Sequence, residues 1–402
     1  MRSRKRPVGA LAVVVASALT ISLAVAAPAT AAPKFPTWAD VQRAKHSVAA
    51  KRAEVKKITA LIAGLQQDAA AAGKVALERG EDYLNAKNAL EAATTKASKL
   101  KSQANAAKQQ ATTSGDEAGQ LAAQLARSGG SSLTMQLLLN GHGASDLLDV
   151  LGTASKLTEN TATIFAQAQQ DKNTAKSLGD EAAVAEAARA KKSAAAQTAL
   201  AAATSAATTA QNRVTAQNKA QTVLTAQLAS LTGKSKKTEA AYFAGVAWEK
   251  KQEAQTAPPA DGTPTGPIPG APSGSAVAGA IRFAEDQLGE PYVLDGMGPN
   301  VWDCSGLTKA AYASVGVYIG THSATDQYNT LRAENRLVPL SERVAGDILW
   351  YSDGGSTSAV KYHVTLYIGN GQMIEAPYPG ATVRIRPVRF GDLVPYAGRP
   401  TG

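Results

Sequence analysis

Trp302-Asp303-Cys304-Ser305-Gly306-Leu307 contains the only cysteine among the 402 residues of this chain. A loop rich in Gly, Pro and Asn, residues 296–300, precedes it, and a helix-compatible run, Ser305 to Ser314, follows it. We therefore expect Cys304 at or just before a helix N-terminus, where the helix dipole and unpaired N–H groups favour a thiolate over a thiol. Because the thiolate is the nucleophilic form, Cys304 is a candidate nucleophile if the chain also supplies a base.

The N-terminus has the pattern of an export signal. Arginine and lysine dominate the first six residues, an apolar run extends from about Val8 to Ala27, and Ala29-Thr30-Ala31 offers small residues for a cleavage site. We interpret residues 1–32 as a secretory signal peptide, with an uncleaved membrane anchor as the alternative. In an exported protein a lone cysteine is an intermolecular partner, an inert buried thiol or a reactive group.

The charge balance points to an anionic surface as a partner. The formal net charge is +10, and the sequence pI is about 9.5. A basic exported protein suits teichoic acids, peptidoglycan carboxylates or phospholipid head groups. Neither zinc-ligand spacing nor interleaved aromatic and basic residues is present, which argues against nucleic acid. The few histidines lack ligand spacing, so we expect no metal site and no cofactor. The sequence leaves the oligomeric state open.

Residues 33–255 are predicted to form an α-helical coiled-coil domain. Apolar or small residues recur at every seventh position from Val55 and again from Ile58, and only Arg79 interrupts the second series. This pattern is typical of the seam of a coiled coil. A single amphipathic helix in solvent is the alternative, but it would leave the seam exposed.

A glycine-rich break at residues 128–131 ends the first long helix. The second helical stretch, from about Ser155 to Leu231, is expected to return antiparallel to the first. Between them lie an apolar patch at residues 133–139 and a short helical segment that begins after Ser145, its candidate N-cap. The patch either closes the end of the hairpin or docks on a membrane or a divisome protein.

A segment rich in Pro, Gly, Thr and Ser, residues 256–275, is predicted to be a flexible linker. It precedes a compact domain at residues 276–402. The pattern predicts helices at 277–289, 304–315 and 323–331, followed by strands at 347–351, 362–368, 372–375 and 383–387. Helices followed by an antiparallel sheet indicate an α+β fold.

His363 is the leading candidate base for Cys304. It begins a predicted strand of apolar and β-branched residues, and Gly369-Asn370-Gly371 then turns the chain into the next strand, which carries Glu375. Counting from the turn, His363 and Glu375 are nearly opposite each other, within one residue of slip. A carboxylate there could orient the imidazole and fix its tautomer.

Four motifs in this order resemble the NlpC-type family of papain-like cysteine peptidases, which act on bacterial cell walls. The resemblance covers about Val277 to Val394. The motifs are Pro291-Tyr292-Val293, Asp303-Cys304-Ser305-Gly306-Leu307, Ala345-Gly346-Asp347-Ile348-Leu349 and His363-Val364-Thr365-Leu366-Tyr367-Ile368-Gly369-Asn370-Gly371. The resemblance implies that Cys304 and His363 are catalytic. The third polar residue of the family is often a histidine, and Glu375 in its place resembles the Rip-type actinobacterial endopeptidases.

The resemblance also implies roles for the neighbours of the nucleophile. Tyr292 would lie near the oxyanion, and Asp303 and Ser305 would line the substrate cleft. The implied substrate is the stem peptide of peptidoglycan, cut between D-glutamate and meso-diaminopimelate by a protein associated with the cell wall. The chain departs from the family at Leu294-Asp295-Gly296, where Trp-Gly-Gly is usual, and at Gly320-Thr321-His322-Ser323, where Arg-Thr-Ser is usual.

Two other functions remain open at this stage. One is a non-catalytic scaffold of the cell wall or the divisome, and the other is a cysteine amidase or acyltransferase that acts on another wall bond. A free peptidase would endanger the wall that contains it. We therefore expect that the coiled coil, or the segment Thr238 to Gln255, covers the Cys304 cleft until a partner moves it.

Overall fold

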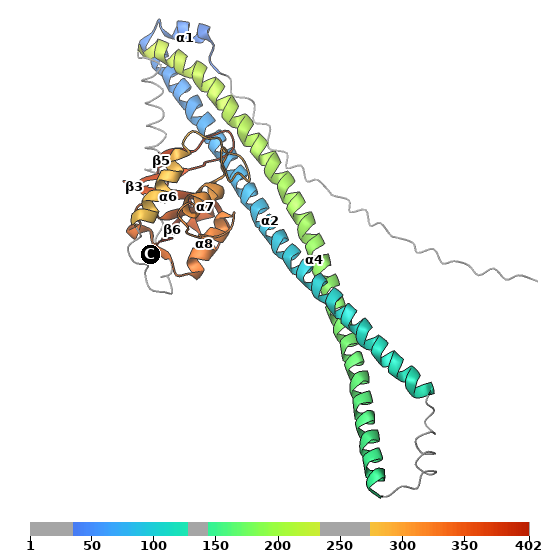
Figure 1. Cartoon of the computed structure of the whole chain (residues 1–402). Coiled ribbons are helices and arrows are strands. Elements are labelled where there is room, and N and C mark those ends of the chain that lie inside the picture. Colours follow the sequence, from blue (N-terminus) through green and yellow to red (C-terminus); the bar gives the residue numbers. More distant parts are fainter. Residues whose placement is uncertain (1–34, 128–143, 234–273, 402) are drawn as a thin grey trace, which may run out of the picture.

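The computed structural model describes residues 35–127, 144–233 and 274–401, which form a long helical hairpin and a compact α+β domain (Figure 1). The predicted signal peptide, the apolar patch at 133–139, the segment Thr238 to Gln255 and most of the predicted linker lie outside these residues. Of the helices formed within the described ranges, none is both long and apolar enough to cross a bilayer.

Two very long helices form the hairpin. Helix α2 spans Val48–Arg127 and α4 spans Ala144–Thr232, and they run antiparallel, with a short helix α1, Trp38–Ala44, at their base (Figure 1). An apolar cluster closes the base, and it consists of Val41, Ala44, Ile58, Ile62, Leu224, Leu228 and Leu231. Farther along, the buried seam is largely alanine. The helical hairpin is as predicted, but the short helix expected after Ser145 is the first part of α4.

The compact domain contains one six-stranded antiparallel sheet in the order β1-β6-β2-β3-β4-β5. Its strands are β1 Leu337–Pro339, β2 Ile348–Ser352, β3 Lys361–Gly369, β4 Gln372–Glu375, β5 Arg384–Pro387 and β6 Leu393–Gly398. Short 3-10 helices, η1 Leu340–Glu342 and η2 Asp353–Gly355, follow β1 and β2. The sequence predicted β2, β3, β4 and β5, and it did not predict β1 and β6.

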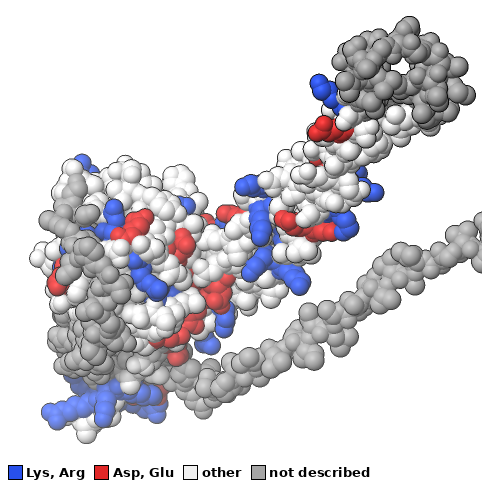
Figure 2. Space-filling view, turned by 90° about the horizontal axis from the view of Figure 1, so that it is seen from below, with Lys and Arg blue, Asp and Glu red and all other residues white. Residues whose placement is uncertain are grey.

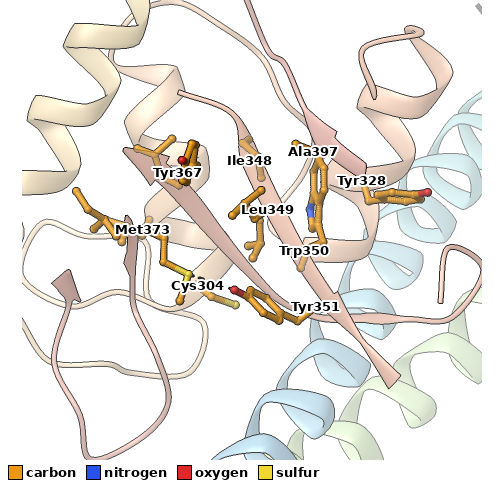
Figure 3. Close-up of a cluster of buried hydrophobic side chains, with 14 of the residues drawn as sticks. Cys304, Tyr328, Ile348, Leu349, Trp350, Tyr351, Tyr367, Met373 and Ala397 are labelled. Atoms are coloured by element: carbon orange, nitrogen blue, oxygen red, sulfur yellow. Dashed lines mark hydrogen bonds between the residues drawn. The ribbon is translucent and has the colours of Figure 1, made fainter. Parts of the chain in front are cut away.

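Helices α7 Cys304–Ala313 and α8 Ala324–Ala333 pack against this sheet, and α6 Gly274–Asp286 packs against α7. Their apolar faces meet the sheet in a core built around Trp350, with the Tyr328 ring edge-on at 5.3 Å (Figure 3). Helix α7 packs against β3, and this packing positions the start of α7 relative to the strand that carries His363. The two candidate catalytic side chains come from these two elements.

The compact domain lies against the N-terminal half of α2, as Figure 1 shows. Leu77 of α2 is buried in the same apolar cluster as Cys304 and Tyr292. Gly73 and Gly80 allow close approach, because a Cβ would lie 2.8 Å from the Tyr378 ring at Gly73 and 3.0 Å from Leu294 at Gly80. A glycine inside a helix lowers helix stability by about 1 kcal/mol relative to alanine, and packing against the domain offsets this loss.

Candidate active site

The start of α7 places Cys304 as predicted, on the first residue of a helix. Asp303 is the N-cap, with extended backbone angles, and its Oδ1 accepts from the Gly306 N–H at 2.7 Å and from the Ser305 hydroxyl at 3.0 Å. The backbone N–H groups of Ser305 and Val364 act on the Cys304 side chain and lower the pKa of its thiol, against the larger effect of burial. Val364 follows His363 on β3, so the sulfur lies beside the backbone of the candidate base.

Gly306 shows why this turn needs a small residue. A Cβ at Gly306 would lie only 2.0 Å from the carbonyl oxygen of Gly296, so any side chain would push the 296–300 loop away from the helix. The same carbonyl accepts from the Asp303 N–H at 2.9 Å. The loop that precedes the nucleophile is therefore held directly on the first turn of α7.

His363 and Glu375 are hydrogen-bonded. The Nε2 of His363 lies 2.9 Å from Oε2 of Glu375, and both side chains are buried. The β3–β4 register pairs Leu366 with Ile374, which puts Glu375 across from Thr365, two residues from His363 rather than within one. The contact survives this offset because side chains two residues apart share one face of a strand.

The other ring nitrogen of His363, Nδ1, is buried and has no hydrogen-bond partner among the residues that the structure describes. The ring packs against Tyr351, with centroids 5.6 Å apart. Since Nε2 is engaged by Glu375, Nδ1 is the nitrogen left for the Cys304 thiol. This arrangement matches the role of a base whose tautomer is fixed by a third group.

Two arginines hold Glu375 from the far side. Its Oε1 accepts from Arg384 at 3.1 Å, and its Oε2 lies 2.8 Å from Nη1 of Arg389. Burial opposes ionisation of Glu375, but Arg389, the His363 hydrogen bond and Arg384 outweigh it and hold the pKa well below its usual range. Neither arginine was predicted from the sequence, because Arg384 meets Glu375 through the β4–β5 register and Arg389 reaches it from beyond the end of β5.

His322 is a further partner of Asp303, and no role was predicted for it from the sequence. His322 Nε2 lies 2.7 Å from Asp303 Oδ2, and its Nδ1 lies 3.2 Å from Asp295 Oδ1. Burial lowers the His322 pKa, but these two carboxylates raise it to about 9. The N-cap of the nucleophile helix is thus held by a cation. Ser323, not His322, is the N-cap of α8.

Tyr292 and Ser305 are both buried in this structure. Burial, followed by the nearby Cys304 and Asp303, raises the pKa of Tyr292 well above its usual value, so its hydroxyl keeps its proton. A protonated phenol next to the sulfur can donate to an oxyanion, which suits the expected role. The Ser305 hydroxyl donates to Asp303 and belongs to the first turn of α7.

Helix α2 supplies an acid next to this site. Glu81 of α2 is buried, and its charge acts on both Cys304 and Tyr292. Burial first, then Asp303 and Glu81, raises the pKa of the Cys304 thiol well above its usual value. Burial also lowers the pKa of His363. With α2 in place, the pair is therefore a thiol and a neutral imidazole, not the thiolate–imidazolium pair of an active cysteine peptidase.

Ion pairs fasten α2 on both sides of Glu81. Lys74 Nζ lies 2.7 Å from a carboxylate oxygen of Asp353 and from one of Asp392, and Lys87 Nζ lies 2.7 Å from Asp295. Figure 2 shows basic and acidic side chains interspersed along the visible face of the hairpin, so this face has no continuous patch of a single sign of charge. The pairs at Lys74 and Lys87 lie where the domain docks.

Known proteins match the compact domain. Residues 289–394 match the model of the NlpC/P60 family. The peptidoglycan endopeptidase RipB of Mycobacterium tuberculosis is 40% identical over 159 residues, which are 36% of this chain and 62% of RipB. The peptidoglycan endopeptidase RipA of Mycolicibacterium smegmatis is 35% identical over 155 residues, 35% of this chain and 29% of RipA.

The solved P60 domain of an antigen from M. avium subspecies paratuberculosis is 34% identical. The match covers 32% of this chain and 96% of that domain, with a TM-score of 0.27. The chain spans less than two thirds of the length of the curated relatives reported above.

Proposed function

We propose that the chain is a secreted peptidoglycan hydrolase, because residues 289–394 match the model of the NlpC/P60 family and the chain is similar to peptidoglycan endopeptidases. Its reaction is that of a cysteine D,L-endopeptidase, which cuts stem peptides between D-glutamate and meso-diaminopimelate during cell-wall remodelling or cell separation. The observation that carries this proposal is the site itself. Cys304 begins a helix and lies near the backbone N–H of Val364, and His363 is hydrogen-bonded through Nε2 to Glu375, while its Nδ1 has no partner among the described residues.

The geometry supports the following sequence of steps. The Nδ1 of His363 takes the Cys304 proton, and the sulfur attacks the peptide carbonyl carbon. N–H groups at the start of α7 and the Tyr292 hydroxyl stabilise the oxyanion. The C–N bond breaks as His363 returns the proton to the leaving amine. His363 then takes a proton from water, the resulting hydroxide attacks the thioester, and Cys304 leaves with its electron pair and recovers a proton.

We infer that α2 keeps this site closed. Leu77 of α2 is buried in the same apolar cluster as Cys304, and Glu81 is buried as well, which supports a site that a stem peptide reaches only when α2 is displaced. We infer that the full chain is a latent peptidase. A cell-envelope partner that moves the hairpin would activate it. Of the two covers expected from the sequence, α2 of the coiled coil is the one we propose, and the segment Thr238 to Gln255 lies outside the described residues.

The test uses a chain opened by Gly73→Leu, because a side chain at Gly73 collides with Tyr378. The opened chain is incubated with peptidoglycan, and the products are identified by mass spectrometry. We expect fragments that end at D-glutamate. Adding Cys304→Ala should abolish them, and Cys304→Ser should leave almost no activity, because a serine hydroxyl is far less acidic than a thiol.

Two results would count against this function. Cleavage by the opened Cys304→Ala chain near the rate of the opened chain would show that Cys304 is not the nucleophile. Products cut at the sugar–peptide amide would assign the chain to the amidase alternative. A chain that neither cleaves nor reacts with a thiol probe in the opened form would fit the scaffold alternative.

A further inference from the structure

The two segments in which this chain departs from the NlpC-type pattern meet in the structure. Asp295 belongs to the first, Leu294-Asp295-Gly296, and His322 belongs to the second, Gly320-Thr321-His322-Ser323. The Nδ1 of His322 lies 3.2 Å from Oδ1 of Asp295. Both departures therefore contribute to one ion pair, which lies beside the start of α7.

The surroundings of His322 require its ring to be a cation. Its other nitrogen, Nε2, lies 2.7 Å from Oδ2 of Asp303, and the side chain is 7% exposed. A neutral imidazole has one donor and one acceptor nitrogen, whereas an ionised carboxylate only accepts. A neutral ring would therefore turn a lone pair toward one of the two carboxylates. Only the doubly protonated ring donates to both.

This bridge fastens the first turn of α7 from outside the helix. Asp303 is the N-cap of α7, and its other oxygen, Oδ1, accepts from the Gly306 N–H at 2.7 Å. A Cβ at Gly306 would lie 3.2 Å from Nε2 of His322, so the ring packs directly on this turn. The bridge thus holds Asp295 and the N-cap together at the turn where Cys304 begins the helix.

The bridge also affects the charge beside the sulfur. After the larger effect of burial, the charge of Asp303 raises the pKa of the Cys304 thiol. A cation in contact with Asp303 offsets that charge, because an opposite charge nearby favours the ionised form of an acid. Loss of the His322 proton would leave Asp303 and Asp295 without their shared cation, and the thiolate would become less favourable.

Other ionisable groups lie around the bridge. Those bonded to Asp295 or to the sequence neighbours of His322 are Tyr83, Lys87 and Glu81 of α2 and Asp326 of α8. In the closed chain Lys87 shares Asp295 with His322. Displacement of α2 takes Lys87 away, whereas His322, Asp295 and Asp303 all belong to the compact domain. The bridge is therefore present in the opened chain as well.

We propose that His322 is a positioning residue of the reaction: as an imidazolium it joins Asp303 to Asp295, holds the N-cap of the nucleophile helix and favours the Cys304 thiolate. This inference rests on the proposed function. Burial lowers the pKa of His322, but the two carboxylates outweigh it and raise the pKa to about 9. Activity that depends on the bridge is therefore complete below this pH and is lost as pH rises through it.

The first test measures kcat/KM of the opened chain, Gly73→Leu, on a synthetic stem peptide from pH 6 to pH 10. We expect His322→Gln to lower kcat/KM at pH 7 at least about fivefold, mainly through kcat, since one neighbouring charge moves a pKa by about one unit. The difference between the two chains should shrink as pH rises through about 9.

Asp295→Asn tests the bridge by a second route. An amide can donate to the lone pair of a neutral Nδ1, so His322 no longer needs both protons. The alkaline fall of kcat/KM should therefore move to lower pH by at least about one unit. Asparagine also suits the backbone, because Asp295 has a φ of 62°, in the left-handed region that Asn tolerates.

A third measurement reads the nucleophile without any substrate. The opened chain is alkylated with iodoacetamide at pH 7, and the rate reports the fraction of Cys304 thiolate. His322→Gln should slow alkylation about tenfold if the pKa of the thiol rises by about one unit. Failure of every opened chain to cleave peptide or peptidoglycan would overturn the proposed function, while alkylation would still decide whether His322 acts on Cys304.

The controls separate the bridge from general effects of substitution. His46→Gln and Asp286→Asn replace exposed residues and should change neither the pH profile nor alkylation. Circular dichroism should show that all the variants keep their fold. A loss in His322→Gln that is equal at every pH would overturn the proposal. An alkaline fall that Asp295→Asn does not move, or alkylation that His322→Gln does not slow, would overturn it too.

Discussion

At the scale of single residues, the candidate base is controlled by charges that do not touch substrate. Glu375 is kept ionised by Arg384 and Arg389, and it holds His363 by Nε2. An ionised orienter stabilises the imidazolium that forms when His363 takes the Cys304 proton. The two arginines therefore set the strength of the base indirectly.

This arrangement ranks two substitutions. In the opened chain, His363→Ala should lower kcat/KM by at least about 10²-fold, the usual contribution of a general base. Glu375→Gln should lower it less, because the amide oxygen can still accept from Nε2. Glu334→Gln, at a surface residue paired with Arg336, is the control and should have no effect. If Glu375→Ala matched the unchanged site, Glu375 would be a bystander.

His322 gives a prediction about pH and stability. Its folded pKa of about 9 exceeds the ordinary value of 6.5, so protonated His322 stabilises the fold. This contribution is complete below about pH 6.5 and is lost as pH rises through about 9. By linkage it amounts to roughly 3 kcal/mol at most.

The measurement is denaturant unfolding of the natural chain and His322→Gln across pH 6 to 10. The advantage of the natural chain should be largest at pH 6 and shrink toward pH 10. His46→Gln serves as the control, since His46 is exposed in the segment between α1 and α2. An advantage that stays constant with pH would mean that His322 contributes by packing and not by charge.

Residue chemistry allowed the sequence to predict the core of the site but not its surroundings. A lone cysteine at a helix start and a histidine on a strand could be paired by type, and the Gly369-Asn370-Gly371 turn brought in Glu375. The turn alone could not give the register, because the β3–β4 pairing shifts between Tyr367 and Gly369. Arg384 could not be found without the β4–β5 register, and Arg389 lies beyond β5, where no strand pattern places it.

At the scale of elements, the prediction of strands failed where proline interrupts the pattern. Strand β6 contains Pro395, and its pairing with β2 shifts between Leu349 and Tyr351, where a missing N–H is tolerated. Strand β1 has only three residues, too few to show alternation. The docking face of α2 was also missed. The sequence signal for this face was the pair Gly73 and Gly80, which lie seven residues apart in a helix although glycine is unfavourable there.

Helix α2 as a cover predicts the effect of a wedge. Gly73→Leu should raise both the rate of peptidoglycan cleavage and the rate of Cys304 labelling at least tenfold relative to the natural chain. The helix itself is not weakened, since leucine favours helix more than glycine does. Gly64→Leu is the matched control, because nothing lies within 4 Å of a Cβ at that position of the same helix.

Two outcomes would contradict the role of α2 as a cover. Equal labelling of the Gly73→Leu and Gly64→Leu chains would show that access to Cys304 does not depend on this contact. Faster labelling without faster cleavage would show that α2 shields the thiol but does not limit the reaction. Circular dichroism of both variants should match the natural chain.

At the scale of the whole molecule, the contacts of α2 with the compact domain that are described above lie nearer to the α1 end of the hairpin than to the far end of α2. They run from Gly73 to Asn88 on α2, whereas the helix continues to Arg127. The sequence predicted the hairpin and the compact domain as separate parts, because heptads and motifs are local patterns. Their docking depends on surface complementarity between residues more than 200 positions apart.

The length of α2 sets the distance between the docked domain and the far end of this helix. With a rise of 1.5 Å per residue, the 39 residues from Asn88 to Arg127 extend about 60 Å beyond the docked domain. A partner that binds the far end of the hairpin would therefore hold the docked domain at this distance from itself. Under the proposed function, that distance from the partner is where the released domain first meets peptidoglycan.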